Sequence, residues 1–207
     1  MLNKNKLSAY QKPLLIVISA PSGAGKSTLC DMLLQKLDNI VYSVSCTTRP
    51  PRGAEVDGED YIFMTDEGFQ QRIDNKEFLE YAEVHGHRYG TLKSVVDSAM
   101  AEGQHVLMDI DVQGARNIRK IISELPEDDP KRRGFVDIFI MPPSLETLKE
   151  RIEKRGEDDR ESINMRMKNA EKEILCKNEF RYVVVNDDLE KAFKELYGII
   201  ESEAQHA

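Results

Sequence analysis

Ten consecutive residues combine small side chains with one cation: Ser19-Ala20-Pro21-Ser22-Gly23-Ala24-Gly25-Lys26-Ser27-Thr28. Glycines at 23 and 25 let the backbone curl so that successive N–H groups point inward, and a following helix adds positive potential. Lys26 would reach terminal phosphates, and the Ser27 hydroxyl would bind magnesium. The strict phosphate-loop pattern, G-x-x-x-x-G-K-[ST], has glycine in place of Ala20, where a methyl group costs little if φ stays negative. We predict a nucleoside triphosphate site formed by Ala20, Pro21, Ser22, Gly23, Ala24, Gly25, Lys26, Ser27 and Thr28.

Arginines follow in two groups. Arg151 and Arg155 are four residues apart, about 6 Å between Cβ atoms on one helical face, and Arg166 follows after a polar bridge. Three guanidinium groups suit a transferring phosphoryl group, whose oxygens share charge in the transition state. Arg49 and Arg52, on a proline-stiffened turn, would hold a second anion, because two phosphates brought together repel and need compensating charge.

Two carboxylates follow the apolar strand predicted at 105–108. Asp109 and Asp111 stand at its carboxyl end, where phosphate-loop enzymes keep a magnesium-directed carboxylate or a substrate contact. Strand alternation predicts that their side chains point to opposite faces. Both roles stay open for Asp109 at this stage.

The elements that position these residues alternate between strand and helix. Five apolar residues, 14–18, run into the phosphate loop, and a helix with an apolar stripe follows it. Further strands are predicted at 41–44, 105–108, 135–141 and 182–185, and the last helix would start with a capping box of Asp187 and Glu190. The block 45–91 breaks this alternation with a predicted hairpin at 57–63, a short helix and a strand.

We therefore predict an α/β, three-layer phosphate-loop NTPase-type fold with a central parallel sheet. Residues 1–44 and 92–207 would form the core, and 45–91 an inserted lobe for the second substrate. Residues from about 155 to 165, a polar bridge between two helices, would form a lid.

Composition narrows the functional classes. The chain has 207 residues, 40% hydrophobic and 32% charged, with a net charge of −8 that argues against a nucleic-acid surface. Three scattered cysteines favour reduced thiols and argue against zinc. The polar start and the absence of a long apolar run predict a cytoplasmic protein without a membrane span. A homo-oligomer stays open.

The chain resembles the guanylate kinase family, and the resemblance covers nearly all of it from residue 14 onward, in eight separated blocks. The residues that carry it are Ser19 to Thr28, Ser45-Cys46-Thr47-Thr48-Arg49-Pro50-Pro51-Arg52, Asp60-Tyr61, Glu77-Phe78-Leu79-Glu80, Tyr89-Gly90-Thr91, Asp109-Ile110-Asp111-Val112-Gln113-Gly114, the stretch from Arg151 to Arg166, and Val185-Asn186-Asp187-Asp188.

This resemblance implies phosphoryl transfer from ATP to GMP or dGMP, with Mg²⁺. It implies that the GMP phosphate is held by Arg49, Arg52, Tyr61 and Tyr89. It implies that the guanine is read or positioned by Ser45, Glu80, Thr91 and Asp109, with Gly90 in the same block. It implies catalytic roles for Lys26, Arg49, Arg151, Arg155 and Arg166, and places Asn186 on the adenine side of ATP.

Three other functional classes share some of these features. Asp111-Val112-Gln113-Gly114 fits the D-x-x-G of GTPase switches, but the chain has no [NT]-K-x-D segment to read guanine. A catalytically dead binding module would lack the phosphate loop. The third is a kinase for another monophosphate, which an assay with AMP, UMP or dGMP would test. The Glu80 carboxylate favours guanine over adenine, because it can accept the adjacent ring N–H and amino group of guanine. Glu80 would otherwise form a structural ion pair with an arginine of the lobe.

Overall fold

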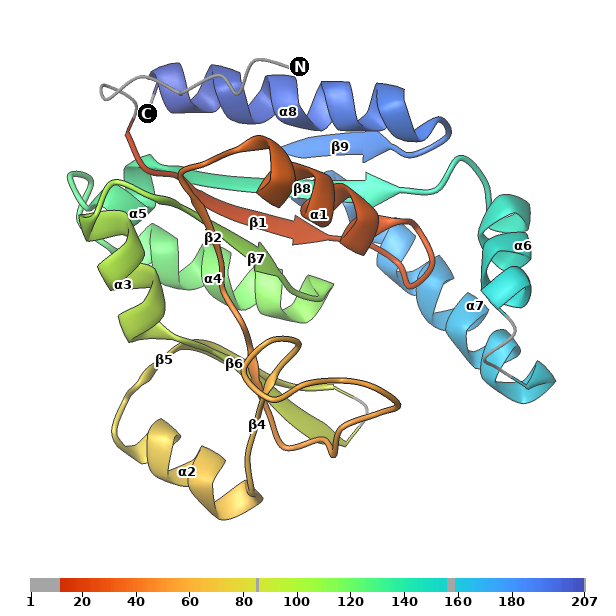
Figure 1. Cartoon of the computed structure of the whole chain (residues 1–207), viewed down its shortest axis with the longest axis horizontal. Helices are drawn as coiled ribbons and strands as arrows, with labels where there is room; N and C mark the ends of the chain where they lie inside the picture. Colours follow the sequence, from red (N-terminus) through yellow and green to blue (C-terminus); the bar gives the residue numbers. More distant parts are fainter. Residues whose placement is uncertain (1–11, 85, 156–158, 207) are drawn as a thin grey trace.

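The central strand of the molecule is β1 (Leu15–Ser19). The structure is a computed structural model that describes residues 12–84, 86–155 and 159–206, and it describes Arg155 by its backbone alone. β1 pairs in parallel with β7 (His105–Asp109) on one side and with β8 (Phe135–Met141) on the other. β2 (Ile40–Tyr42) and β9 (Tyr182–Val185) complete a five-stranded parallel sheet in the order β2-β7-β1-β8-β9 (Figure 1). The expected parallel α/β sheet is confirmed.

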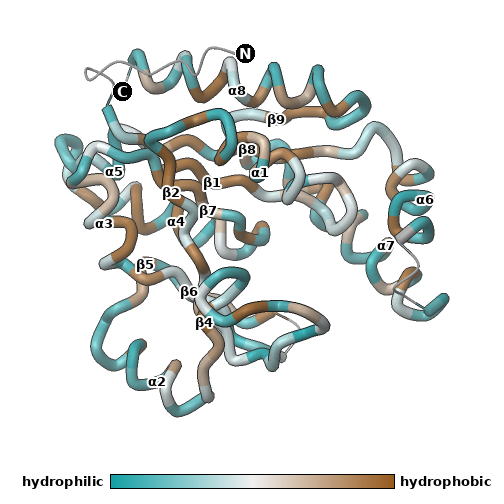
Figure 2. The backbone as a smooth tube through the Cα atoms, viewed as in Figure 1, coloured by the Kyte–Doolittle hydropathy of each residue, from teal (hydrophilic) through white to brown (hydrophobic). Residues whose placement is uncertain are grey.

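Alternate side chains of β1 pack in two separate hydrophobic cores, because successive side chains of a strand point to opposite faces. Ile16 and Ile18 pack with α1 (Lys26–Lys36) and α8 (Leu189–His206) on one face. Leu15 and Val17 pack on the other face with α3 (Lys93–Ala101) and α4 (Val112–Glu124). The result is three layers, with the most apolar segments in the sheet (Figure 2).

Residues 46–92 form a second sheet of four strands, in the order β4-β3-β6-β5. Its elements are β3 (Cys46–Thr47), β4 (Ile62–Phe63), α2 (Asp66–Asp74), β5 (Phe78–Val84) and β6 (His87–Leu92). In Figure 1 this sheet and α2 lie below the central sheet, next to α3 and α4. The boundaries of a separate lobe stay a prediction.

The hairpin predicted at 57–63 is wrong. β4 pairs in parallel with β3, and the only pairing of Asp57 with Tyr61 in the described chain is an isolated parallel bridge. The physical reason lies in the acidic side chains, which bind backbone N–H groups within the loop. Asp60 accepts from the N–H of Val56 at 2.8 Å, and Asp57 accepts from that of Phe63 at 2.9 Å.

Helices α6 (Leu145–Arg155) and α7 (Arg160–Leu175) form an arm at one end of the sheet, where Leu148 and Ile152 pack on Ala170. Residues 156–158 of the predicted lid lie outside the described residues. Between α4 and β8 lies a short helix, α5 (Pro130–Arg133), and a 3₁₀ turn at Lys177–Glu179 leads into β9.

The predicted capping box at Asp187 is also wrong, by one residue. Helix α8 begins at Leu189, and the N–H of Lys191 donates to Asp188 Oδ1 at 2.9 Å. Asp188 is therefore the residue that caps the helix, because a cap accepts from the N–H of the second or third helical residue. In the described part of the chain, no helix is both long and apolar enough to cross a membrane.

Candidate active site

The phosphate loop joins β1 to α1 at the carboxyl end of the central sheet. Gly23 and Gly25 both have φ of +91°, the left-handed conformation that glycine adopts without steric cost. The N–H of Ala24 donates to the Pro21 carbonyl at 3.0 Å, and that of Leu29 to the Gly25 carbonyl at 3.2 Å, so the loop turns tightly into the helix. Ala20 is not among the described residues with positive φ, so its methyl group fits as expected.

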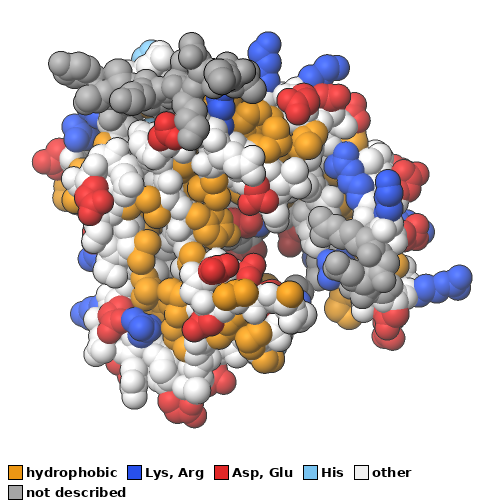
Figure 3. All heavy atoms as spheres, viewed as in Figure 1, with side chains coloured by type: hydrophobic (Ala, Val, Ile, Leu, Met, Phe, Trp, Pro, Cys, Tyr) orange, Lys and Arg blue, Asp and Glu red, His pale blue; other side chains and the backbone are white. Residues whose placement is uncertain are grey.

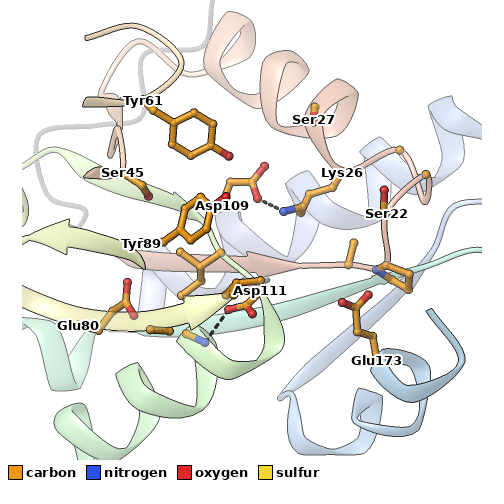
Figure 4. A pocket seen from close by; sticks show the side chains of 18 residues that line it. Ser22, Lys26, Ser27, Ser45, Tyr61, Glu80, Tyr89, Asp109, Asp111 and Glu173 are labelled. Carbon is orange, nitrogen blue, oxygen red and sulfur yellow. Dashed lines mark hydrogen bonds and ion pairs between the residues drawn. The ribbon is translucent and has the colours of Figure 1, made fainter. Parts of the chain in front are cut away.

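Lys26, the first residue of α1, forms an ion pair with Asp109 at the end of β7 (Figure 4). Burial lowers the pKa of Lys26, while Cys30, Asp111 and Glu173 raise it. Asp111 accepts from the N–H of Gly114 at 2.8 Å and caps α4. The prediction that Asp109 and Asp111 face opposite sides is wrong, because the strand ends at Asp109 and both residues line one cavity.

This cavity lies between the phosphate loop, the second sheet and α7, and opens in the hollow beside the α6–α7 arm (Figure 3). Six predicted substrate or magnesium residues border it: Ser27, Ser45, Tyr61, Glu80, Tyr89 and Asp109. In Figure 4, Tyr61 and Tyr89 lie on the side of the second sheet, opposite Ser22 and Ser27 of the loop. The centroids of the two tyrosine rings are 5.9 Å apart, and the rings meet edge to face.

Glu80 is the buried acidic group of the second sheet. Its side chain is 5% exposed, and Oε1 accepts a hydrogen bond of 3.0 Å from the Thr91 hydroxyl across the β5–β6 pair. Burial, and to a smaller extent the charge of Asp111, raise the pKa of Glu80, while the hydrogen bond from Thr91 opposes them. The resulting pKa is about 7. No lysine or arginine of the described chain forms an ion pair with Glu80, so its carboxylate is held by a neutral donor.

The two arginines predicted to hold the second anion, Arg49 and Arg52, do not border the cavity. Arg49 is 5% exposed and forms a two-pronged ion pair with Glu55, at 2.8 and 2.9 Å, beneath the Tyr61 ring. Hydrogen bonding to Arg49 lowers the pKa of Glu55. Glu55 also accepts from the N–H of Arg52 at 2.7 Å, while the Arg52 side chain is exposed. Gly90 and Thr91 stand in β6 without bordering the cavity, and Phe78 and Phe69 would crowd any side chain at 90.

The arginines of the α6–α7 arm contact the loop and its surroundings separately. Arg166 Nη1 donates to the Ser22 hydroxyl at 3.1 Å. Arg151 Nη2 donates to the Asn186 carbonyl at 3.0 Å, beside a second, shallower cavity on the other side of the loop that Asn186 and Thr28 also border. The side chain of Arg155 lies outside the described residues.

Glu173 is a cavity residue that the sequence analysis missed. It comes from α7 and points toward the loop end of the cavity (Figure 4). Burial and the charge of Asp111 raise its pKa to about 7, and Lys26 lowers it. The signal was present in the spacing, because Glu173 follows Arg166 by seven residues and a helix places residues seven apart on one face.

Replacing Glu173 by glutamine is expected to stabilise the ligand-free chain at pH 8 and to leave it unchanged near pH 4.5. The folded pKa of about 7 lies above the ordinary 4.5, so the unfolded chain releases this proton first and stability falls as pH rises between these values. Thermal unfolding at both pH values measures the effect. The exposed Glu171 of the same helix provides the control, Glu171→Gln, for which no such difference is expected; equal shifts in both variants would contradict the assignment.

A guanylate kinase family model matches residues 12–203. The chain belongs to the guanylate kinase family. Guanylate kinase of Thermotoga maritima is 47% identical over 91% of this chain and 86% of that protein, and guanylate kinase of Clostridium perfringens strain SM101 is 48% identical over 96% and 88%. The crystal structure of guanylate kinase from Anaplasma phagocytophilum matches with a TM-score of 0.74 at 34% identity, covering 94% of this chain and 87% of that one.

A gluconokinase structure from Sinorhizobium meliloti also matches, with a TM-score of 0.51 at 14% identity over 94% of this chain, which shows the fold alone. Two kinases of different name thus share the layered architecture. What distinguishes guanylate kinases has to be sought in the side chains that border the cavity, because a fold hosts many activities and function depends on the site.

Proposed function

We infer that this chain is an ATP:GMP phosphotransferase that produces ADP and GDP. The observation that carries the proposal is one cavity with a phosphate loop and Lys26 at one end and the buried Glu80 carboxylate at the other. A triphosphate fits the first end, because inward N–H groups and a lysine attract anions. Guanine fits the second, because its adjacent ring N–H and amino group both donate to one carboxylate.

The reaction requires positioning and charge neutralisation. A GMP phosphate oxygen, ionised at neutral pH, attacks the γ-phosphorus of ATP; the bond to the β–γ bridging oxygen breaks, and its electron pair leaves with ADP. No general base is needed. Lys26, Arg151, Arg155 and Arg166 would neutralise the charge that is shared over the transferring oxygens, and the loop would hold the β-phosphate in line.

Magnesium fits the oxygen groups at the loop end of the cavity. Ser27 offers a hydroxyl, and the Asp109 and Asp111 carboxylates border the same space, which is the hard oxygen set that Mg²⁺ prefers. The ion would add positive charge to the phosphate oxygens of ATP. We propose that Ser27 binds it directly, and that Asp109 either orients it or contacts the guanine.

The remaining substrate contacts extend this proposal. We assign the GMP phosphate to Arg49, Arg52, Tyr61 and Tyr89, and the base to Ser45, Glu80, Thr91 and Asp109, in the block that contains Gly90. For Arg49 this requires sharing or replacing the Glu55 carboxylate with which it now pairs. Asn186 would border the adenine end of ATP, since it lines the second cavity on the outer side of the loop.

We further propose that residues 45–91 move as a lobe against a core of 1–44 and 92–207, and that a lid near 155–165 closes over ATP. Closure would exclude water, which would otherwise accept the phosphoryl group. Addition of GMP is expected to reduce the radius of gyration in small-angle scattering. An unchanged scattering curve at saturating GMP would contradict closure, and AMP is the control ligand.

The activity is tested by a coupled assay of ADP release with ATP and a panel of monophosphates. We expect turnover with GMP and dGMP and little with AMP or UMP. Turnover with another monophosphate alone would overturn the assignment to GMP, and no turnover with any would favour a binding module. We place the enzyme in the cytoplasm, which is consistent with the three free cysteines, Cys30, Cys46 and Cys176.

A further inference from the structure

Asn186 is held on both sides by the backbone of other segments. It follows β9, and its N–H donates to the Met141 carbonyl at the end of β8, at 2.8 Å. Its side-chain Nδ2 donates to the carbonyl of Ala24 in the phosphate loop, also at 2.8 Å. The residue is 4% exposed, so this amide is a buried group with a defined partner. Asn186 therefore fastens the loop to the edge of the central sheet.

The bond to Ala24 fixes the orientation of the next peptide unit. In a trans peptide the carbonyl and the following N–H point in opposite directions, so holding the Ala24 carbonyl toward Asn186 directs the Gly25 N–H away from it. Gly25 borders the main cavity. A Cβ built on Gly25 would lie 2.3 Å from Asn186 Nδ2, so the amide occupies the space that any side chain at 25 would need.

Asn186 also connects the loop to the α6–α7 arm. Its carbonyl accepts from Arg151 Nη2 at 3.0 Å, so one residue contacts an arginine of α6 and the phosphate loop at the same time. A displacement of the Asn186 backbone would move both contacts together. Asn186 therefore links the position of the phosphate loop, through its side chain, to the position of the arm, through its backbone carbonyl.

We propose that Asn186 is a positioning residue whose side-chain amide holds the Ala24–Gly25 peptide in the orientation that binds the triphosphate. This proposal rests on the proposed function for its nucleotide, and it differs from a contact with adenine. A base contact would affect only ligands that carry adenine. A positioning role affects every polyphosphate, with or without a base.

Inorganic tripolyphosphate separates the two roles, because it has neither base nor sugar. Its affinity for the full chain can be measured by calorimetry without turnover, so the result is independent of the assay that tests GMP phosphorylation. In Asn186→Ala, the loss of a buried hydrogen bond is expected to weaken tripolyphosphate about tenfold and to raise the KM for ATP by a similar factor. GMP affinity is expected to stay within about twofold.

Asn186→Asp provides a second variant of nearly the same volume, in case the alanine variant fails to fold. Its carboxylate cannot donate to the Ala24 carbonyl, so it is expected to weaken tripolyphosphate at least as strongly. Asn75→Ala is the matched control, because it removes an amide hydrogen bond to Glu77 beside α2, away from the loop. Unchanged tripolyphosphate affinity in a folded Asn186 variant would overturn the proposal, and an ATP-only defect would assign Asn186 to the base.

Discussion

Replacing Lys26 by methionine is expected to lower kcat with ATP and GMP about 10³-fold, the loss that follows removal of a preorganised charge from a phosphoryl-transfer site. The side chain is similar in length but carries no cation, so the developing charge on the transferring oxygens loses one partner. Lys26 also pairs with Asp109 in the ligand-free chain. Steady-state kinetics with saturating substrates measures the effect, and thermal unfolding shows whether the fold is intact.

The same helix supplies the control for this prediction. Lys36 lies at the other end of α1, with its amine over the Tyr197 ring at 5.7 Å, far along the helix from the cavity. Lys36→Met removes an equal charge from α1 and is expected to leave kcat within about twofold. Normal turnover in a folded Lys26→Met variant would exclude the role of Lys26 in phosphoryl transfer.

The second large effect is expected at Glu80, where glutamine should reduce kcat/KM for GMP about 10²–10³-fold and weaken the preference for GMP over IMP. A carboxamide presents one acceptor and one donor group, so it cannot accept from both guanine donors, and a site built for such bonds rejects a mismatched partner strongly. The Thr91 hydroxyl can still donate to the remaining oxygen, so the local fold is kept. Initial rates with GMP and IMP measure the change in preference.

Glu83→Gln is the matched control, since Glu83 lies on the same strand three residues on with an exposed side chain. It is expected to keep both the rate and the preference. The pH profile adds an independent readout: with a pKa of about 7, Glu80 is protonated below neutrality, so kcat/KM for GMP should fall with decreasing pH in the wild type. The glutamine variant should lose the part of this dependence that Glu80 contributes, so its profile should be flatter than that of the wild type. A base preference unchanged by Glu80→Gln would contradict the assignment.

The parallel sheet and the phosphate loop could be predicted because local pattern determines them. An apolar run, glycines and a following apolar stripe specify strand, turn and helix within one short stretch of the chain. The loop glycines have positive φ, which lets the backbone curl there as expected. Short strands were harder. β3 and β4 have two residues each, and their parallel pairing depends on contacts between Cys46 and Ile62 that no local periodicity records.

The sequence predicted which residues border the cavity better than it predicted which side chains contact one another. Tyr61, Tyr89 and Glu80 border the cavity together. Side-chain pairing was not readable from the chain, because the partner that Arg49 selects, Glu55, is set by the path of an irregular loop. Glu173 was missed although its spacing from Arg166 places it on the same helical face, because a glutamate on a polar helix resembles any solvated residue until the helix packs against the loop.

The contact between Asn186 and Ala24 joins residues 162 positions apart, and the loop also receives Arg166 from the last quarter of the chain. During synthesis on the ribosome, the N-terminal segment emerges long before these partners, so early exposure of the glycine-rich turn does not give a finished nucleotide site. Translation must pass residue 186 before the turn can be fastened. Nascent chains that stop short of that point are expected to lack tight ATP binding. The phosphate loop is therefore synthesised well before it can bind its ligand.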